Sequence, residues 1–125
     1  MYLIDTHVLI WSLFDTDNLS DTAKIIIEND EKIFVSIASL WEIAIKQSIG
    51  KLKIDSSINE ISKQCDIAKI NILNIRPEHL DLIKALPPIH NDPFDRLIIA
   101  QAIIEKMSLI TADSKISKYD IQTKW

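Results

Sequence analysis

The feature that most constrains the fold is a helix predicted to begin at Pro93 and to run through Ile104, because nearly every position around it is hydrophobic. Asp92 suits the N-cap of this helix, and Pro93 suits its first position, where a missing N–H costs nothing. The apolar residues that follow cover most of its circumference: Leu97, Ile98, Ile99, Ala100, Ala102, Ile103 and Ile104. A helix that is apolar on almost all sides is buried, so other structure must cover it.

Asp95 is the exception on this helix. At helical spacing it shares a stripe with Ile98 and Ala102, so its carboxylate is predicted to point inward. It could simply complement the helix dipole in the first turn. A carboxylate removed from water, however, needs an opposite charge, hydrogen bonds or a metal ion, and the rest of the chain must supply one of these.

Short apolar segments typical of buried strands alternate with helical patterns along the whole chain. Strands are predicted at residues 1–5, 32–36, 70–75 and 108–113, and helices at 6–14, 21–29 with Ser20 as cap, 38–49, 57–68, 77–86 and from 93 onward. Gly50 suits a left-handed cap at the end of the third helix. This order predicts a single domain over residues 1–125 of the α/β class, a three-layer α/β/α sandwich with a central parallel sheet, followed by a short polar tail.

The composition excludes several classes of protein. The single cysteine, Cys65, rules out an internal disulfide framework and a cysteine-rich zinc site. No apolar run reaches the roughly 18 residues of a membrane span and no signal peptide precedes the first strand, so we expect a cytoplasmic protein without membrane association. The net charge of −4 gives no general attraction to nucleic acid, so binding of phosphate would need a local basic patch or metal ions.

Four acidic residues have buried or strand-end positions. Asp5 and Asp113 end the first and last predicted strands, Glu42 lies on an apolar stripe of its helix, and Asp95 is described above. Chemistry in parallel α/β sheets gathers at the carboxyl ends of the strands. Carboxylates brought together there repel one another unless Mg²⁺ or Mn²⁺ neutralises them. Such ions, often a pair about 3.5–4 Å apart, activate a water for phosphodiester cleavage.

Each acid also has a purely structural interpretation. Asp5 and Asp113 could cap the elements that follow them, as Asp92 is expected to do. Glu42 could pair with Lys46 one helical turn later. The sequence leaves these alternatives open.

Substrate and partner contacts are harder to predict. Arg96 and Lys46, with Lys51 and Lys53, could form a phosphate-binding rim for RNA, or could be ordinary solvated cations. His90 is a candidate group at the edge of the site, whereas His7 and His79 are expected to be structural or surface residues. Trp11 and Trp41 are expected in the core or at an interface, which leaves room for an apolar patch that binds a second copy or a partner protein.

Four segments carry a family resemblance, namely LIDTHVLIW, SLWEIAIK, HNDPFDRLIIAQA and LITAD. In order and spacing they resemble the PIN-domain ribonucleases, in particular the VapC-type toxins of bacterial toxin–antitoxin pairs. The resemblance implies an α/β/α sandwich, a Mg²⁺- or Mn²⁺-dependent endoribonuclease acting on RNA, and a small antitoxin as partner. A homodimer is expected as well.

Carried over residue by residue, the resemblance places the acidic site on Asp5, Glu42, Asp95 and Asp113. Thr111 matches a hydroxyl beside the metal. Thr6 and Asp92 are expected around these ligands, Asp92 as a supporting or capping residue.

Two rival functions remain at this stage. A receiver-type phosphorylation switch has a similar size and an acidic Mg²⁺ pocket, but it needs an aspartate at the end of a central strand. The candidate for that strand, residues 70–75, ends at Arg76 and Pro77. A PIN-like fold without catalysis, which only binds RNA or protein, is the second rival, although all four acids are present.

Overall fold

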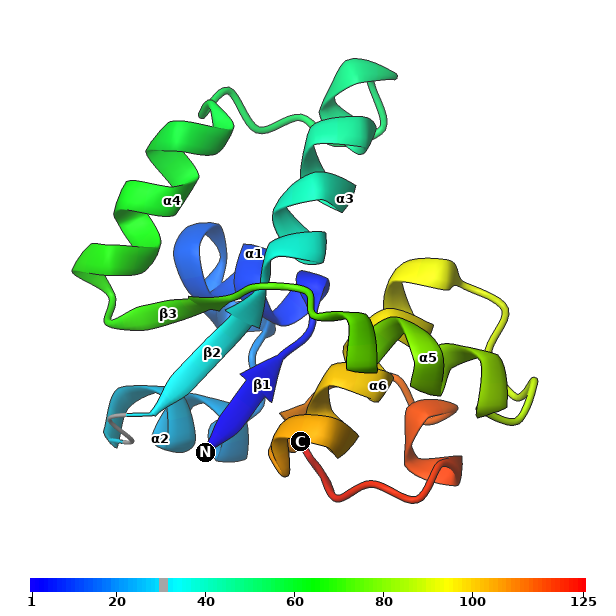
Figure 1. Ribbon diagram of the computed structural model, residues 1–125. Helices are drawn as coiled ribbons and strands as arrows, with labels where there is room; N and C mark the ends of the chain where they lie inside the picture. The colour runs from blue at the N-terminus through cyan, green and yellow to red at the C-terminus, as the bar shows by residue number, and fades with distance from the viewer. Residues whose placement is uncertain (30–31) are drawn as a thin grey trace.

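The computed structural model describes residues 1–29 and 32–125, and within them five strands form one parallel sheet in the order β3-β2-β1-β4-β5 (Figure 1). The strands are β1 (Tyr2–Ile4), β2 (Ile33–Ser36), β3 (Ile70–Leu73), β4 (Ser108–Ile110) and β5 (Thr123–Lys124). β1 is the middle strand. The prediction that the segment 70–75 is a central strand is therefore wrong, because β3 lies at the edge of the sheet.

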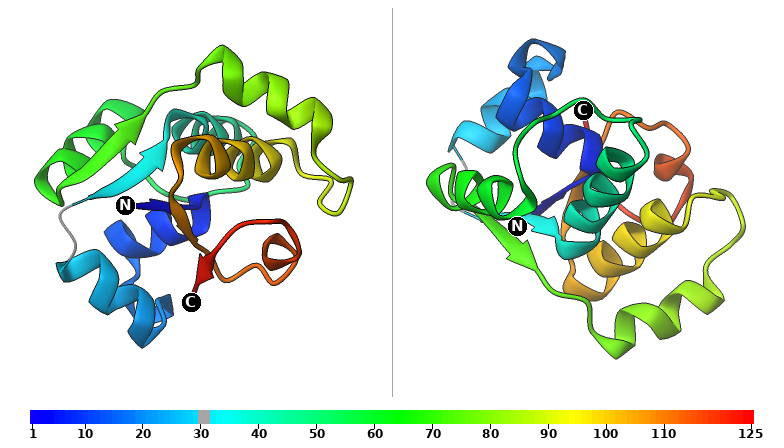
Figure 2. Two further views of the ribbon diagram at one scale, coloured as in Figure 1. Left: turned by 60° about the horizontal axis from the view of Figure 1, so that its bottom comes forward. Right: turned by 90° about the horizontal axis from the view of Figure 1, so that it is seen from above.

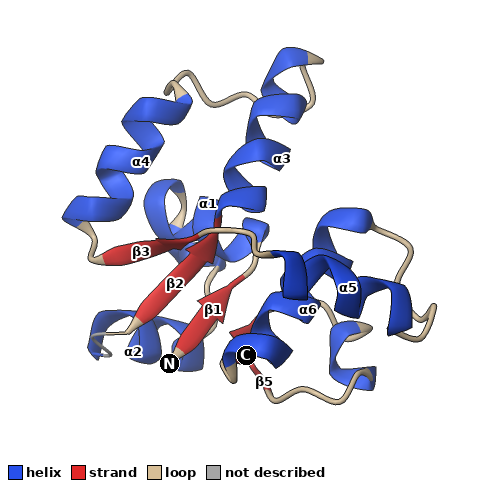
Figure 3. Cartoon of the chain, viewed as in Figure 1, coloured by secondary structure: helices blue, strands red, loops and turns tan. Residues whose placement is uncertain are grey.

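The helices lie close to the predicted ranges (Figure 3). They are α1 (Thr6–Phe14), α2 (Asp21–Asn29), α3 (Ile37–Ser48), α4 (Ile58–Ile67), α5 (Pro77–Ala85) and α6 (Pro93–Glu105), with short 3-10 turns η1 (Thr16–Asn18) and η2 (Ile116–Lys118). Ser20 caps α2 through the amide of Ala23, as predicted. Gly50 has a φ of +73°, which confirms the left-handed cap after α3.

The sheet separates two hydrophobic clusters, which confirms the three-layer sandwich (Figure 2). Because side chains alternate along a strand, Leu3 and Leu109 pack on one face with α6. Ile4 and Ile110 pack on the other face with Val8 of α1 and with residues of α2 and α4. α6 is buried from Leu97 to Ala102, as its apolar circumference predicts. No helix in the described part of the chain is long and apolar enough to cross a bilayer.

The last segment of the chain differs from the prediction. Residues after 113 do not form a simple polar tail, because they carry η2 and then β5, which pairs in parallel with β4. Ile116 and Tyr119 are buried and hold the segment against the core. β5 consists of the polar residues Thr123 and Lys124 alone, so it gives no periodic signal for a strand and only the backbone pairing reveals it.

A buried histidine joins α5 to α6. The His79 side chain is fully buried, its Nδ1 accepts from the amide of Arg76 at 2.9 Å, and its Nε2 lies 2.7 Å from Glu105 Oε2. Hydrogen bonds from Arg76 and His79 hold the pKa of Glu105 below its usual range. The expectation that His79 is structural is therefore confirmed.

We expect His79→Ala to lower the free energy of unfolding by about 1–3 kcal/mol, because the variant leaves buried polar groups unpaired and opens a cavity. Urea denaturation measures the change. Lys84→Ala, in the exposed part of the same helix, is the matched control and should stay within about 0.5 kcal/mol of the wild type. An equal effect of the two substitutions would contradict the role given to His79.

Candidate metal centre

The predicted acidic residues come together at the carboxyl ends of β1 and β4. Asp5 directly follows β1, and its amide donates to the carbonyl of Ile110 at the end of β4. Asp113 lies three residues beyond that strand. Glu42 comes from α3, which begins directly after β2, and Asp95 lies in the first turn of α6. Four separate elements thus meet at one edge of the sheet.

Asp5 caps the helix that follows it, which was one of its two interpretations, and it also contacts Thr111. Its Oδ1 accepts from the amide of Val8 at 2.8 Å, so it caps α1. Its Oδ2 accepts from the Thr111 hydroxyl, which ties β1 to the segment after β4. Burial raises the pKa of the Asp5 carboxyl, although its hydrogen bonds from Thr111 and Val8 work in the opposite direction.

Thr111 is buried between two of the acids. Its Oγ1 donates to Asp5 and accepts from the amide of Asp113 at 3.0 Å. One hydroxyl therefore fixes the side chain of Asp5 and the backbone of Asp113 at once.

Glu42 is buried with one partner on each oxygen. The Thr6 hydroxyl donates to Oε1 at 2.7 Å and also lies 2.9 Å from Ser39 Oγ. Lys46 Nζ lies 2.8 Å from Oε2, so the predicted pair one helical turn apart is formed. The Thr6 side chain is thus close to both Glu42 and the N-terminus of α1, where Asp5 acts as cap.

Asp95 has the most strongly perturbed carboxyl of the site. Its side chain is 24% exposed, and its pKa is raised to about 7, first by burial and then by the charges of Asp92, Asp5 and Glu42. Asp92 caps α6 through the amides of Phe94 and Asp95, which confirms the predicted cap. The negative charges around Asp95 exceed the positive charge that the nearby side chains supply.

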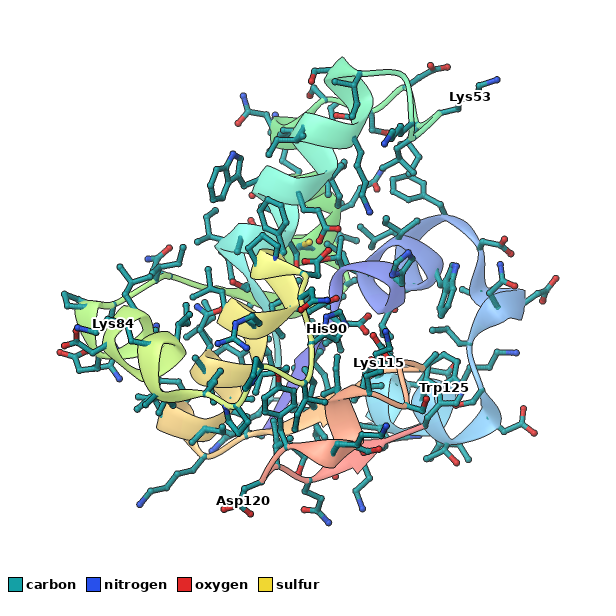
Figure 4. The ribbon with its side chains drawn as sticks, turned by 90° about the vertical axis from the view of Figure 1, so that its right-hand side faces the viewer. Lys53, Lys84, His90, Lys115, Asp120 and Trp125 are labelled. Carbon is teal, nitrogen blue, oxygen red and sulfur yellow. The ribbon has the colours of Figure 1, made fainter. Side chains whose placement is uncertain are left out.

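His90 belongs to the site rather than to its margin. Its Nε2 lies 2.7 Å from Asp113 Oδ2 and 3.2 Å from Asp95 Oδ2. Figure 4 shows His90 near the centre of this face, with Lys84 and Asp120 toward its margins. Burial alone would raise the pKa of Asp113, but hydrogen bonds from His90 and from the amide of Lys115 hold it below its usual range.

The two cations suggested for RNA contact have other partners. Arg96 donates to the carbonyls of Ile83, Leu86, Pro87 and His90 at 3.0–3.4 Å, all in or before the connection between α5 and α6. Lys46 is paired with Glu42, and its side chain is 35% exposed. Tyr119, whose hydroxyl contacts the same connection, is a further residue of this region that no pattern in the sequence indicates.

The donor set fits a hard divalent cation. Asp5, Glu42, Asp95 and Asp113 provide carboxylate oxygens, which Mg²⁺ and Mn²⁺ prefer. Burial is the largest cause of the raised pKa of Asp95 and neighbouring carboxylates add to it, whereas a bound cation would favour the ionised form. One oxygen each from Asp95 and Asp113 lies with a nitrogen of His90 in a group whose atoms are within 4.8 Å of one another.

Comparison with known proteins gives one family and several structures of similar fold. The family model described as the PIN domain matches residues 2–122. No curated protein matches the sequence significantly. Solved structures match as well, and five of them share 15–21% identity with the chain, which establishes likeness of fold alone.

Three of these structures cover almost the whole chain. VapBC2 from Rickettsia felis, bound to a DNA fragment from its promoter, has a TM-score of 0.68 and 17% identity, covering 99% of this chain and 98% of that one. VapBC-1 from nontypeable Haemophilus influenzae has a TM-score of 0.67 and 21% identity, covering 98% and 96%. A toxin–antitoxin complex from Klebsiella pneumoniae has a TM-score of 0.66 and 20% identity, covering 100% and 97%.

Proposed function

The chain belongs to the PIN domain family, and from that premise we propose that it is an endoribonuclease that hydrolyses RNA phosphodiesters with Mg²⁺ or Mn²⁺. The observation that carries the proposal is the meeting of Asp5, Glu42, Asp95 and Asp113 at the carboxyl ends of β1 and β4, where oxygens of Asp95 and Asp113 lie within 4.8 Å of each other. A binding module without catalysis would have no need of this arrangement, whose repulsion destabilises the fold.

Asp5, Asp95 and Asp113 would hold the cation, and Glu42 would complete the site. When bound, the cation lowers the pKa of a water and stabilises the charge that develops on the phosphoryl oxygens. Thr111 holds Asp5 in place, since its hydroxyl donates to that carboxylate. Thr6 and Lys46 fix the orientation of Glu42, which would help to orient the attacking water. No side-chain nucleophile is required.

The test is cleavage of several structured RNAs by the purified protein with Mn²⁺ or Mg²⁺, beside a sample in excess chelator. Asp5→Asn is the informative variant, because Asn also caps a helix well while removing the charge. Asp55→Asn, an exposed acid, is the control, purified in the same way. Cleavage that needs metal and is lost only in Asp5→Asn supports the nuclease; equal cleavage by both variants indicates a contaminant, and no cleavage by any sample favours the binding module.

We further propose that the protein is the toxin of a toxin–antitoxin pair and acts in the cytoplasm on RNA. The structures of similar fold support this, since they include a toxin–antitoxin complex from Klebsiella pneumoniae and the VapBC proteins of Rickettsia felis and Haemophilus influenzae. Expression should arrest growth of a bacterial host, and Asp5→Asn should relieve the arrest. Arrest by both proteins alike would count against toxicity through the acidic site.

A homodimer is the assembly we propose. Large apolar side chains lie exposed along α3, where Trp41 is 59% and Ile49 is 58% exposed, and the Trp41 ring packs against Phe94 at a centroid distance of 5.1 Å. A second copy would cover them. Sedimentation equilibrium should give twice the chain mass for the wild type and a smaller mass for Trp41→Lys, and a wild-type monomer would refute the proposal.

A further inference from the structure

The connection between α5 and α6 is held by side chains from outside it. Pro87 and Pro88 have no amide hydrogen, so this connection has few donors of its own, although the amide of Ile89 donates to the Pro87 carbonyl at 2.9 Å. Arg96 supplies further donors to Leu86, Pro87 and His90, and its guanidinium also reaches Ile83 in α5.

Tyr119 adds a second tether at the same place. Its hydroxyl donates to the Pro87 carbonyl at 2.8 Å and accepts from the amide of His90 at 2.8 Å. The Tyr119 side chain is buried. The backbone of His90 is thus fixed on its amide by Tyr119 and on its carbonyl by Arg96.

The ring of His90 is oriented as firmly as its backbone. Nδ1 accepts from the amide of Asp92 at 3.1 Å, so Nδ1 carries no proton and the ring proton is on Nε2. Nε2 then donates to Asp113 Oδ2 at 2.7 Å, and Asp95 Oδ2 lies 3.2 Å from the same nitrogen. A nitrogen that donates a proton has no lone pair for a cation, so in this arrangement His90 orients the carboxylates and does not bind metal itself.

We propose that His90 is a positioning residue of the cation site, which holds Asp113 and Asp95 facing each other, and that Arg96 and Tyr119 act on the site through it. This inference rests on the proposed function, since it assumes that the two carboxylates receive a cation. Asp113 most needs the contact. Its side chain is 35% exposed and, without the donor on Oδ2, keeps only the contact of Oδ1 with the amide of Lys115, so Oδ2 can turn toward water and away from the charge of Asp95.

Four variants separate this role from a general effect on the fold. His90→Ala removes the donor, and His90→Gln offers an amide N–H that can partly replace it. Tyr119→Phe keeps the volume of the buried ring and removes only the tether on the connection. Asn91→Ala is the matched control, because Asn91 is an exposed neighbour in the same connection.

The measurement is the dissociation constant for Mn²⁺, obtained by titration calorimetry on full-length chains without RNA, at one pH and with folding checked by circular dichroism. We expect His90→Ala to weaken binding about 10–100-fold, as is typical when a group that orients a ligand is lost. His90→Gln should recover part of the loss, and Asn91→Ala should match the wild type. Tyr119→Phe should weaken binding in the wild-type background and add nothing in the His90→Ala background, because the tether acts through His90.

Unchanged or tighter Mn²⁺ binding by a folded His90→Ala protein would overturn the positioning role, and tighter binding would mean that the imidazole competes with the cation. A full additional loss from Tyr119→Phe in the double variant would overturn the part given to Tyr119. Failure of the wild type itself to bind Mn²⁺ would instead refute the cation site, and with it the proposed function.

Discussion

Asp95→Asn is expected to reduce metal-dependent RNA cleavage by about a thousandfold or more while the protein stays folded. The substitution keeps the shape of the side chain and removes one negative charge from the centre of the acidic cluster. Asp95 faces the charges of Asp92, Asp5 and Glu42, so the site loses the carboxylate on which a divalent cation would most depend. Initial rates with Mn²⁺ on one structured RNA give the ratio directly.

Asp120→Asn is the control for this experiment. Asp120 is an exposed acid that Figure 4 shows at the margin of the face, away from His90. The Asp120→Asn protein should cleave RNA at the wild-type rate. This control separates the specific effect of Asp95 from the effect of losing one negative charge. If Asp95→Asn kept full activity in Mn²⁺ and lost it in chelator, cleavage would depend on a cation that Asp95 does not bind. Asp95 would then have to be removed from the proposed ligands.

The second large effect concerns stability without metal. In chelator, the free energy of unfolding is expected to fall by about 2–4 kcal/mol between pH 4.5 and pH 7.5, if the shift of Asp95 is converted at about 1.4 kcal/mol for each pKa unit. The pKa of the aspartate carboxyl is near its usual value of 3.8 in the unfolded chain, whereas that of the folded Asp95 is about 7. Between these values the folded state holds a proton that the unfolded state has lost, so raising the pH favours unfolding.

Other carboxyls modify this profile without reversing it. The raised pKa of Asp5 adds to the loss of stability. The lowered pKa values of Asp113 and Glu105 contribute stability that is lost as the pH falls below the usual carboxyl range, outside this window. Urea titrations at several pH values give the profile.

The same titrations on Asp95→Asn test the assignment. The variant cannot ionise at this position, so its profile should be flatter and its stability at neutral pH higher than that of the wild type. At neutral pH, saturating Mn²⁺ should raise the free energy of unfolding of the wild type, because a ligand stabilises the state that binds it. The increase should be much smaller for Asp95→Asn. A wild-type profile that rises over this window, or two parallel profiles, would contradict the raised pKa.

Local signals in the sequence predict most of the fold. The apolar circumference of α6 predicts its burial, and Ser20, Gly50 and Asp92 mark helix ends that the structure confirms. Strand order depends on pairing between distant segments, which periodicity does not encode. For that reason β3 was expected near the centre and β5 was not expected at all.

In the candidate site, too, local patterns predict some residues and not the contacts between distant segments. Asp5, Glu42, Asp95 and Asp113 stand out because each has a charge where the local pattern predicts an apolar environment or a strand end. Their proposed catalytic roles stay predictions. The contacts of His90 with Asp113 and of Tyr119 with Pro87 join residues 23 and 32 positions apart. Nothing in the spacing of these residues predicts such contacts, because the connection between α5 and α6 meets the segment after β4 only in the folded chain.

The hydrogen bond between Asp5 and Thr111 joins residues 106 positions apart, and β5 at the end of the chain pairs with the strand that leads to Thr111. During synthesis, Asp5 must therefore wait for the next 106 residues before it can meet Thr111. A nascent chain that stops before Thr111 contains all six of the described α-helices but has no assembled acidic cluster. A nuclease with this topology would become active only after the segment from Thr111 to Asp113 has been made.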